Sequence, residues 1–96
     1  MATLRIEHGI HDFDSWKAAF DRDPAGRKRS GVRYYRVLRP VDDPAYIMID
    51  LDFDTVAEAE SFLEVMHGVW GSPQAAPALV GTPRTRIVEA VETEDL

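Results

Sequence analysis

The stretch "DFDS" at residues 12–15 returns as "DFDT" at residues 52–55, and a strand-like run precedes each copy. After each copy apolar residues recur at helical spacing, which predicts two amphipathic helices. An Asp, Ser or Thr just before a helix accepts hydrogen bonds from the free N–H groups of its first turn, and a carboxylate there suits the positive end of the helix dipole. We therefore expect the repeated acids to be caps and junction residues rather than metal ligands: Asp12, Asp14, Asp52 and Asp54.

The rest of the chain supplies the partners of these two units. Strands are predicted at 3–10, 32–39, 45–51 and 84–92, with "PVDDPA" turning between the second and third. The second helix has a capping-box spacing at Thr55–Glu58 and is expected to end near His67-Gly68, with a short helical turn starting at Ser72-Pro73. The order β-α-β-β-α-β is the ferredoxin-like arrangement. We expect one α+β domain over 1–96, an antiparallel four-stranded sheet with both helices on one face, and the first and third strands in its centre.

The face of the sheet that the helices do not cover is expected to pack against a partner. The run "YIMIDL" at 46–51 is nearly continuously apolar, as in strands buried on both faces. A homodimer pairing two such faces is the simplest way to cover it, held by apolar contacts rather than by charge. The offset of 40 residues between the repeats, however, places Arg5 and Glu7 on the same face as Ile47 and Ile49. That face is then either partly polar or shifted by a bulge.

Composition narrows the function classes. The 96 residues are 45% hydrophobic and 29% charged and carry a net charge of −6, which disfavours general nucleic-acid binding. No apolar run is long enough for a membrane span, no signal peptide is evident, and there is no cysteine, so a cytoplasmic location is expected. The charge is uneven: six basic residues and no acid lie between Arg27 and Arg39, and the end, "EAVETEDL", is acidic and expected to fray into solvent.

Several stretches resemble a known group. "HDFDSWKAAFD", "RVLRPVDDPAYIMIDLDFDTVAEAESFL" and the Gly68-Val69 segment are similar to small bacterial proteins labelled cyclase or hypothetical protein, within the dimeric α+β barrel superfamily. That superfamily also holds the antibiotic-biosynthesis-type monooxygenases. The resemblance implies a sheet-to-sheet dimer, a pocket between helices and sheet, and chemistry done without a metal or flavin cofactor. It implies no particular catalytic residue.

Two histidines are the candidate catalytic residues. His8 shares its strand face with Leu4, Ile6 and Ile10, so it points into the core if that face lies under the helices. An imidazole there is either a hydrogen-bonded core residue or a base with a pKa suited to proton transfer. His67 is expected at the end of the second helix, where a cation suits the dipole, or at a pocket mouth. His11 is expected to be exposed at the junction.

The large and basic side chains are the candidate ligand contacts. At these spacings the aromatic residues are core residues or the walls of a small-molecule pocket. The basic residues from 27 to 39 either form salt bridges across a dimer, bind an anionic ligand or carrier, or contact RNA. Alternation leaves open which of the two adjacent tyrosines faces the helices. The predicted substrate-binding set, with no metal ligand in it, is Trp16, Tyr34, Tyr35, Arg36, Met66 and Trp70.

Two functions from different classes remain. One is a cofactor-independent enzyme acting on a small aromatic or polyketide-like molecule, by proton transfer leading to cyclisation or isomerisation, or by oxygenation. The other is a non-catalytic dimeric binding or accessory protein. A cavity of about 300 Å³ or more lined by His8 and aromatic rings is expected of the enzyme, and a core filled by Trp16 and Trp70 of the alternative.

Overall fold

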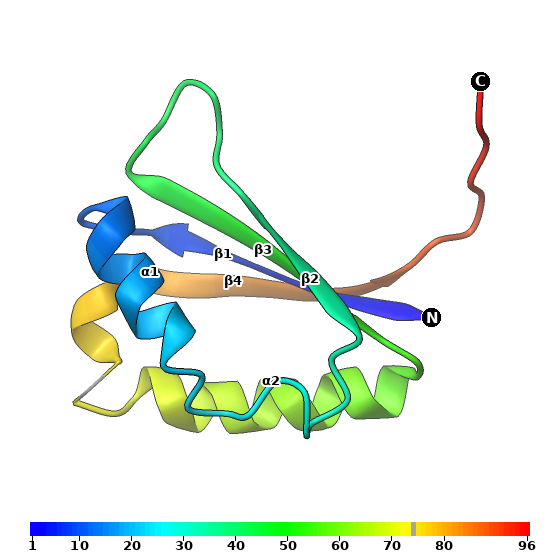
Figure 1. The fold of residues 1–96 in the computed structure, drawn as a ribbon, viewed down its shortest axis with the longest axis horizontal. Coiled ribbons are helices and arrows are strands. Elements are labelled where there is room, and N and C mark those ends of the chain that lie inside the picture. Colours follow the sequence, from blue (N-terminus) through cyan, green and yellow to red (C-terminus); the bar gives the residue numbers. More distant parts are fainter. Residues whose placement is uncertain (74) are drawn as a thin grey trace.

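The chain folds into a four-stranded antiparallel sheet with two α-helices on one side (Figure 1). The computed structural model describes residues 1–73 and 75–96. The strand order is β2-β3-β1-β4, so the first and third strands are central and the ferredoxin-like prediction is confirmed. The elements are β1 (Ala2–Gly9), α1 (Phe13–Asp21), β2 (Tyr34–Leu38), β3 (Tyr46–Phe53), α2 (Val56–Trp70), the 3₁₀ turn η1 (Ala76–Ala78) and β4 (Val80–Glu89).

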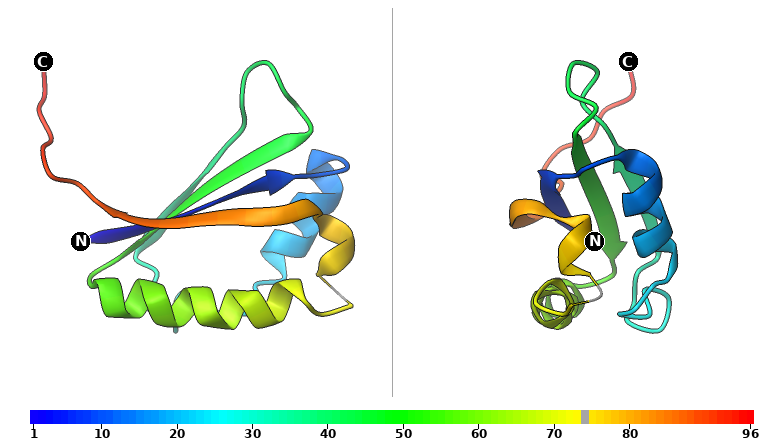
Figure 2. Two further views of the ribbon diagram at one scale, coloured as in Figure 1. Left: turned by 180° about the vertical axis from the view of Figure 1, so that it is seen from behind. Right: turned by 90° about the vertical axis from the view of Figure 1, so that its left-hand side faces the viewer.

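The core lies between the sheet and the helices. Alternate residues of the two central strands point to this face and are almost fully buried, from Ala2 to His8 on β1 and from Ile47 to Phe53 on β3. Trp16 of α1 and Phe62 of α2 close the core from the other side. Helix α2 runs beneath the strands, and the hairpin loop and the C-terminal tail rise on the opposite side (Figure 2). We call this opposite side of the sheet the open face.

The open face is polar, which corrects the prediction that a continuous apolar strand needs cover on both faces. The register pairs Ile6 with Ile49 and His8 with Ile47, so the apolar residues of β1 and β3 share the face under the helices. The alternate residues of β3, including Asp50, lie with Arg5 on the open face. The 40-residue offset pointed the wrong way because the two helix caps, Asp12 and Thr55, lie 43 residues apart, and an odd difference moves each side chain to the other face.

The helix caps show that difference. Asp12 caps α1 by accepting from the Ser15 N–H at 2.8 Å, whereas α2 is capped by Thr55, which accepts from the Glu58 N–H at 3.1 Å. The prediction that Asp14 and Asp54 are caps was therefore wrong, because Asp14 lies inside the first turn of α1 and Asp54 precedes Thr55, the cap of α2. The other repeated acids serve different roles: Asp52 accepts from Thr3 in the sheet and Asp54 pairs with Arg33.

Thr55→Ala is expected to lower the free energy of unfolding by about 0.5–2 kcal/mol, because α2 loses the acceptor for a first-turn N–H. Thr93→Ala is the matched control, since Thr93 lies exposed in the tail and should leave stability unchanged. Urea denaturation of both variants measures the difference. Equal midpoints for the two variants would show that the Thr55 cap contributes nothing.

The end of α2 differs from the sequence prediction. The helix runs on through His67 and Gly68 to Trp70, and its cap Gly71 has right-handed φ −83°, so no left-handed glycine ends it. The turn predicted from Ser72-Pro73 appears later, at η1, and residue 74 lies outside the described residues. The last strand begins at Val80 rather than at residue 84.

Candidate functional site

A cavity lies between the sheet and the two helices. His8 and Ile6 of β1, Trp16 and Phe20 of α1, and side chains near the end of α2 line it. Its volume is about 80 Å³, room for two or three water molecules at about 30 Å³ each. Small-molecule pockets start at about 300 Å³, so the cavity as it stands is smaller than the one expected of an enzyme.

His8 places a polar ring at the floor of this apolar cavity. The side chain is 3% exposed, and its Nδ1 lies 2.8 Å from the Gly9 carbonyl oxygen. Because a carbonyl only accepts, Nδ1 carries the proton and Nε2 holds the free lone pair. No fully buried side-chain nitrogen or oxygen in residues 1–73 and 75–96 lacks a partner, and no hydrogen bond to Nε2 is present, so Nε2 is reached from the cavity.

The electrostatics of His8 keep the ring neutral. Burial lowers the pKa of His8 from its ordinary value of 6.5, and the hydrogen bond to Gly9 offsets part of that effect. The backbone also changes at this point, since Glu7 pairs with Arg84 but Gly9 pairs with Val80, which leaves residues 81–83 of β4 opposite His8. Gly81 in this bulge has φ +78°, a conformation that suits glycine. β-Bulges are over-represented next to active sites.

Stacked aromatic rings form one wall of the cavity. The Trp16 and Phe20 rings stack with centroids 4.9 Å apart, and Tyr35 of β2 meets Phe20 edge-on at 5.1 Å. The Arg27 guanidinium lies 3.8 Å from the Phe20 ring centroid and donates to the Phe20 carbonyl. Arg27 also pairs with Asp23 at 3.6 Å, so both charges at the rim are already partnered.

The structure brings together only part of the predicted site. Among the predicted residues, His8, Trp16, Met66 and Trp70 line the cavity. Tyr35 is the tyrosine of β2 that faces the helices, one ring away from it. The cavity lining does not include His67, which is exposed on α2 with its ring 5.7 Å from Trp70, or His11, which is exposed after β1. Tyr34 and Arg36 lie on the open face, opposite Asp52 and Asp50.

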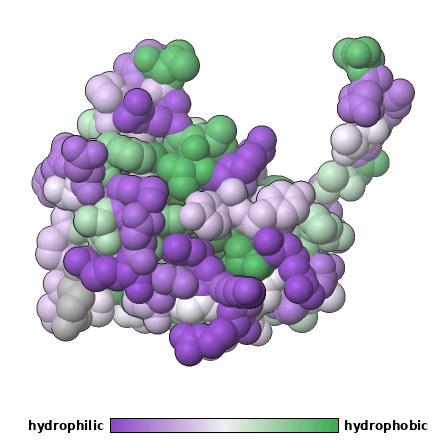
Figure 3. Space-filling view, in the orientation of Figure 1, coloured by the Kyte–Doolittle hydropathy of each residue, from purple (hydrophilic) through white to green (hydrophobic). Residues whose placement is uncertain are grey.

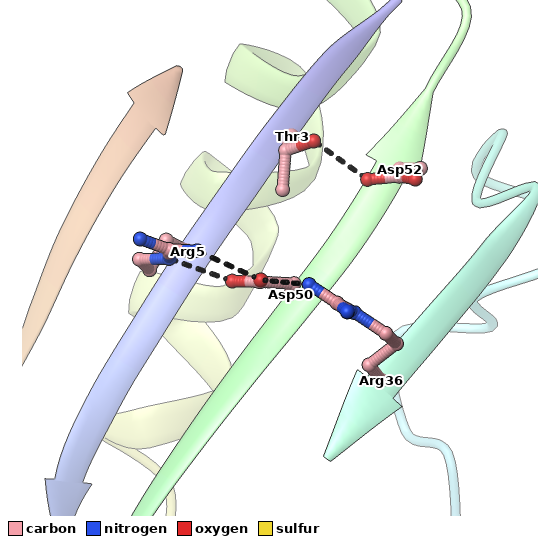
Figure 4. A network of polar contacts seen from close by, with 5 residues as sticks. All are labelled: Thr3, Arg5, Arg36, Asp50 and Asp52. Carbon is pink, nitrogen blue, oxygen red and sulfur yellow. Dashed lines mark hydrogen bonds and ion pairs between the residues drawn. The ribbon is translucent and has the colours of Figure 1, made fainter. Parts of the chain in front are cut away.

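Arg36 belongs to a polar network on the open face rather than to the cavity (Figure 4). Asp50 is 4% exposed and accepts from Arg5 at 2.8 and 3.0 Å and from Arg36 at 3.3 Å. These hydrogen bonds, that from Arg5 foremost, hold the pKa of Asp50 below its usual range. Thr3 donates to Asp52 beside them at 2.6 Å. The basic run thus forms salt bridges within one chain, of Arg27, Arg33 and Arg36.

The lining residues that were not among the predicted contacts include Phe20, Asp23 and Arg27. Phe20 stands four positions after Trp16 and so shares its helix face, a signal that pointed only to the core. Asp23 and Arg27 come from the loop after α1, whose path no periodic pattern gives. Within the described ranges, no three His, Asp or Glu side chains converge to hold a metal ion, and no helix is long and apolar enough to cross a bilayer.

Solved structures of similar shape are known. SnoaB, a cofactor-independent oxygenase from Streptomyces nogalater, matches over 96% of this chain and 94% of its own, with a TM-score of 0.72 and 15% identity. An antibiotic biosynthesis monooxygenase matches over 96% of this chain and 100% of its own (TM-score 0.57, 10% identity). A dimeric ferredoxin-like protein from an uncultured marine organism matches over 97% of both chains (TM-score 0.64, 10% identity).

The chain has the ferredoxin-like fold of these proteins. At 10–15% identity the likeness is one of fold, and it extends over the whole sheet and both helices. No protein-family model and no curated sequence matches the chain. The functional argument therefore depends on the residues of the cavity.

Proposed function

We propose that this chain is a small-molecule enzyme in which His8 acts as a general base on an aromatic, polyketide-like substrate. The observation that carries the proposal is the free Nε2 of His8, on a neutral buried ring, facing a cavity walled by Trp16 and Phe20. A general base must be unprotonated at the working pH and must have its proton acceptor within reach of the substrate proton. The aromatic side chains in the cavity wall can stack on a flat substrate ring.

Oxygenation is the reaction we favour, because SnoaB, of the same fold, is named a cofactor-independent oxygenase. In the first step Nε2 takes the proton of a phenolic O–H, and the electron-rich ring that results reacts with dioxygen. A C–O bond forms to give a ring hydroperoxide, whose outer oxygen takes the proton back from His8. The ring C–H and O–O bonds then break and water leaves, so one phenol and one O₂ give one quinone and one H₂O. The same proton transfer without dioxygen would lead to cyclisation or isomerisation.

Ligand entry requires the cavity to widen. A cavity of about 150 Å³ holds a benzene ring, roughly twice the volume present here. Met66 and Trp70, both half-buried near the end of α2, are the side chains placed to move. Methionine has three rotatable bonds and adapts readily to a bound ligand.

We also propose that the protein is a homodimer joined through the open face of the sheet. The support is the fold, since one structure of this shape is described as a dimeric ferredoxin-like protein. The polar character of the face in this chain means that such a dimer would be held by charge and hydrogen bonds, not by the apolar contacts expected from the sequence.

The small cavity favours a second candidate, a non-catalytic dimeric binding or accessory protein. Trp16 and Trp70 line a cavity of only about 80 Å³, as expected for a closed core. In that case His8 is a core residue whose hydrogen bond to Gly9 satisfies its ring.

Dioxygen uptake with a panel of hydroxylated naphthalenes tests the enzyme proposal, with quinone formation followed by absorbance. His8→Gln is expected to lower kcat/KM by about 10²-fold or more, because the base is lost. His11→Gln, at an exposed position, is the matched control and should keep full activity. The rate should rise with pH through the lowered pKa of His8 and then level off, since the base must be neutral.

Two results would contradict the enzyme. One is equal activity of the His8→Gln and His11→Gln variants, which would show that His8 is not the base. The other is neither dioxygen uptake nor a thermal shift with any member of the panel, which would favour the non-catalytic candidate.

A further inference from the structure

The open face of the sheet carries an imbalance of charge. Asp50 forms ion pairs with both Arg5 and Arg36, and Glu7 accepts a hydrogen bond from Tyr46 at 2.8 Å. The side chains that the register places on this face include four arginines and three acids: Arg5, Arg36, Arg84 and Arg86 against Glu7, Asp50 and Asp52. The face therefore has more positive than negative charge, although the whole chain is acidic.

Arg84 and Arg86 on β4 carry the excess. The register places Arg86 directly opposite Arg5 and Arg84 opposite Glu7. Within residues 1–73 and 75–96 neither makes an ion pair, and both are exposed. Like charges directly opposite each other in an antiparallel pair destabilise a sheet. A carboxylate from outside the sheet would therefore offset the repulsion between Arg86 and Arg5.

The acidic end of the chain stands on the same side of the sheet. After β4 the tail rises away from the strands, as does the hairpin loop between β2 and β3, with the open face between them (Figure 1). Both project as separate arms with apolar ends (Figure 3), and Val41 and Leu96 are fully exposed. The tail carries Glu92, Glu94 and Asp95 and no basic residue.

Between the tail and the sheet lies a groove of about 510 Å³. Its floor is polar, with Tyr34 and Arg36 from β2 and Asp52 from β3, and Thr93 stands on its other side. The chain itself leaves this space open. A second copy lying on the open face would fill the groove and would be held between the two arms.

We infer that, in a dimer joined through the open face, the acidic tail of each copy lies on Arg84 and Arg86 of the other copy. The inference rests on the homodimer proposed above and adds the contacts that hold it. Charge complementarity supports it, since three acids meet two arginines that form no ion pair within residues 1–73 and 75–96 of their own chain. Twofold symmetry makes the contact occur twice, because each copy offers the same tail and the same strand.

Charge reversal at both ends of the contact tests the inference. Sedimentation equilibrium at low salt compares wild type, Arg84→Glu/Arg86→Glu, Glu92→Lys/Glu94→Lys/Asp95→Lys, and the combination of all five changes. Each set alone is expected to weaken the dimer by about tenfold or more, as several exposed ion pairs become repulsive, and raised salt should weaken the wild-type dimer. The combined variant should recover most of the affinity.

A matched control keeps the test specific. Lys28→Glu/Arg29→Glu makes the same charge change as the arginine pair, in an exposed loop away from the open face, and should leave the dimer unaffected. Thermal unfolding by circular dichroism shows whether each variant folds.

The outcomes separate this inference from the dimer itself. A wild-type dimer that all reversed variants match at every salt concentration would overturn the tail contact and leave the dimer standing. Weakening by each set without recovery in the combination would also overturn the direct contact. A wild type that stays monomeric at millimolar concentration would remove the dimer and the inference with it.

Discussion

Phe53→Ala is expected to lower the free energy of unfolding by about 3–5 kcal/mol, the largest stability change of the single substitutions considered. Phe53 is 0% exposed at the end of β3, and its ring lies 5.5 Å from that of Phe62 on α2. Truncation removes a buried ring and leaves a cavity between strand and helix that the fixed backbone fills only in part. A domain of this size has about 5–15 kcal/mol in total, so the variant would be close to unfolding.

Val41→Ala is the control for this substitution, because Val41 is fully exposed at the hairpin loop and should change stability by less than about 0.5 kcal/mol. Urea denaturation gives both values, and an unchanged slope confirms that the same surface is exposed on unfolding. A loss below about 1 kcal/mol for Phe53→Ala would mean that the end of β3 is not packed against α2.

The fold could be predicted because its signals are local. Alternation gave the strands, helical spacing gave the helices, and their order left the ferredoxin-like arrangement as the solution. What failed was the comparison of the two halves. The repeat aligns Phe13 with Phe53, but Phe13 begins α1 and Phe53 ends β3. Because side chains alternate along a strand, an alignment that is wrong by one residue places every side chain of the strand on the wrong face of the sheet.

The apolar run of β3 shows the same limit. Tyr46 and Met48 read as core residues in the sequence, yet both lie on the open face, where Tyr46 donates to Glu7. Tyrosine has an apolar ring and a polar tip, and methionine is flexible, so both are compatible with either face. A strand that alternates in space can therefore look continuously apolar in the sequence. Asp50 was the one residue of the run that marked the polar face.

The candidate site was predictable only where one element decided the direction of a side chain. His8 followed from the alternation of β1, and Trp16 and Met66 from helical spacing. The choice between Tyr34 and Tyr35 needed the pairing of β2 with β3, which sets the face and is not written in β2 itself. Arg27 needed the path of a loop. Long-range geometry of this kind has no signature in a single sequence.

Asp50→Ala is the second large effect, expected to cost about 1–3 kcal/mol of unfolding free energy. Asp50 is buried and accepts three hydrogen bonds from two arginines, so its removal leaves both guanidinium groups without their acid. Breaking a fully buried ion pair costs about 3–5 kcal/mol, but the Arg5 and Arg36 side chains are 46% and 65% exposed, and solvent screens the charges that remain.

The pH dependence of Asp50→Ala gives the same contact a second readout. The pKa of Asp50 is held below its unfolded value of 3.8, first by the hydrogen bond from Arg5. A carboxyl with a lowered pKa stabilises the fold above its unfolded value and loses that contribution as the pH falls through the folded one. The difference in stability between wild type and Asp50→Ala should therefore be constant near neutral pH and shrink below pH 3.8.

Two further variants assign the effect to charge and burial. Asp50→Asn keeps the shape and one acceptor oxygen, so its loss should fall between those of wild type and Asp50→Ala. Asp54→Ala removes an exposed carboxylate that pairs with Arg33 and should change stability little, because water replaces the lost contact. If Asp50→Ala and Asp54→Ala cost the same, burial adds nothing to the Asp50 network. The positive charge of the open face would then be balanced by solvent rather than by this single acid.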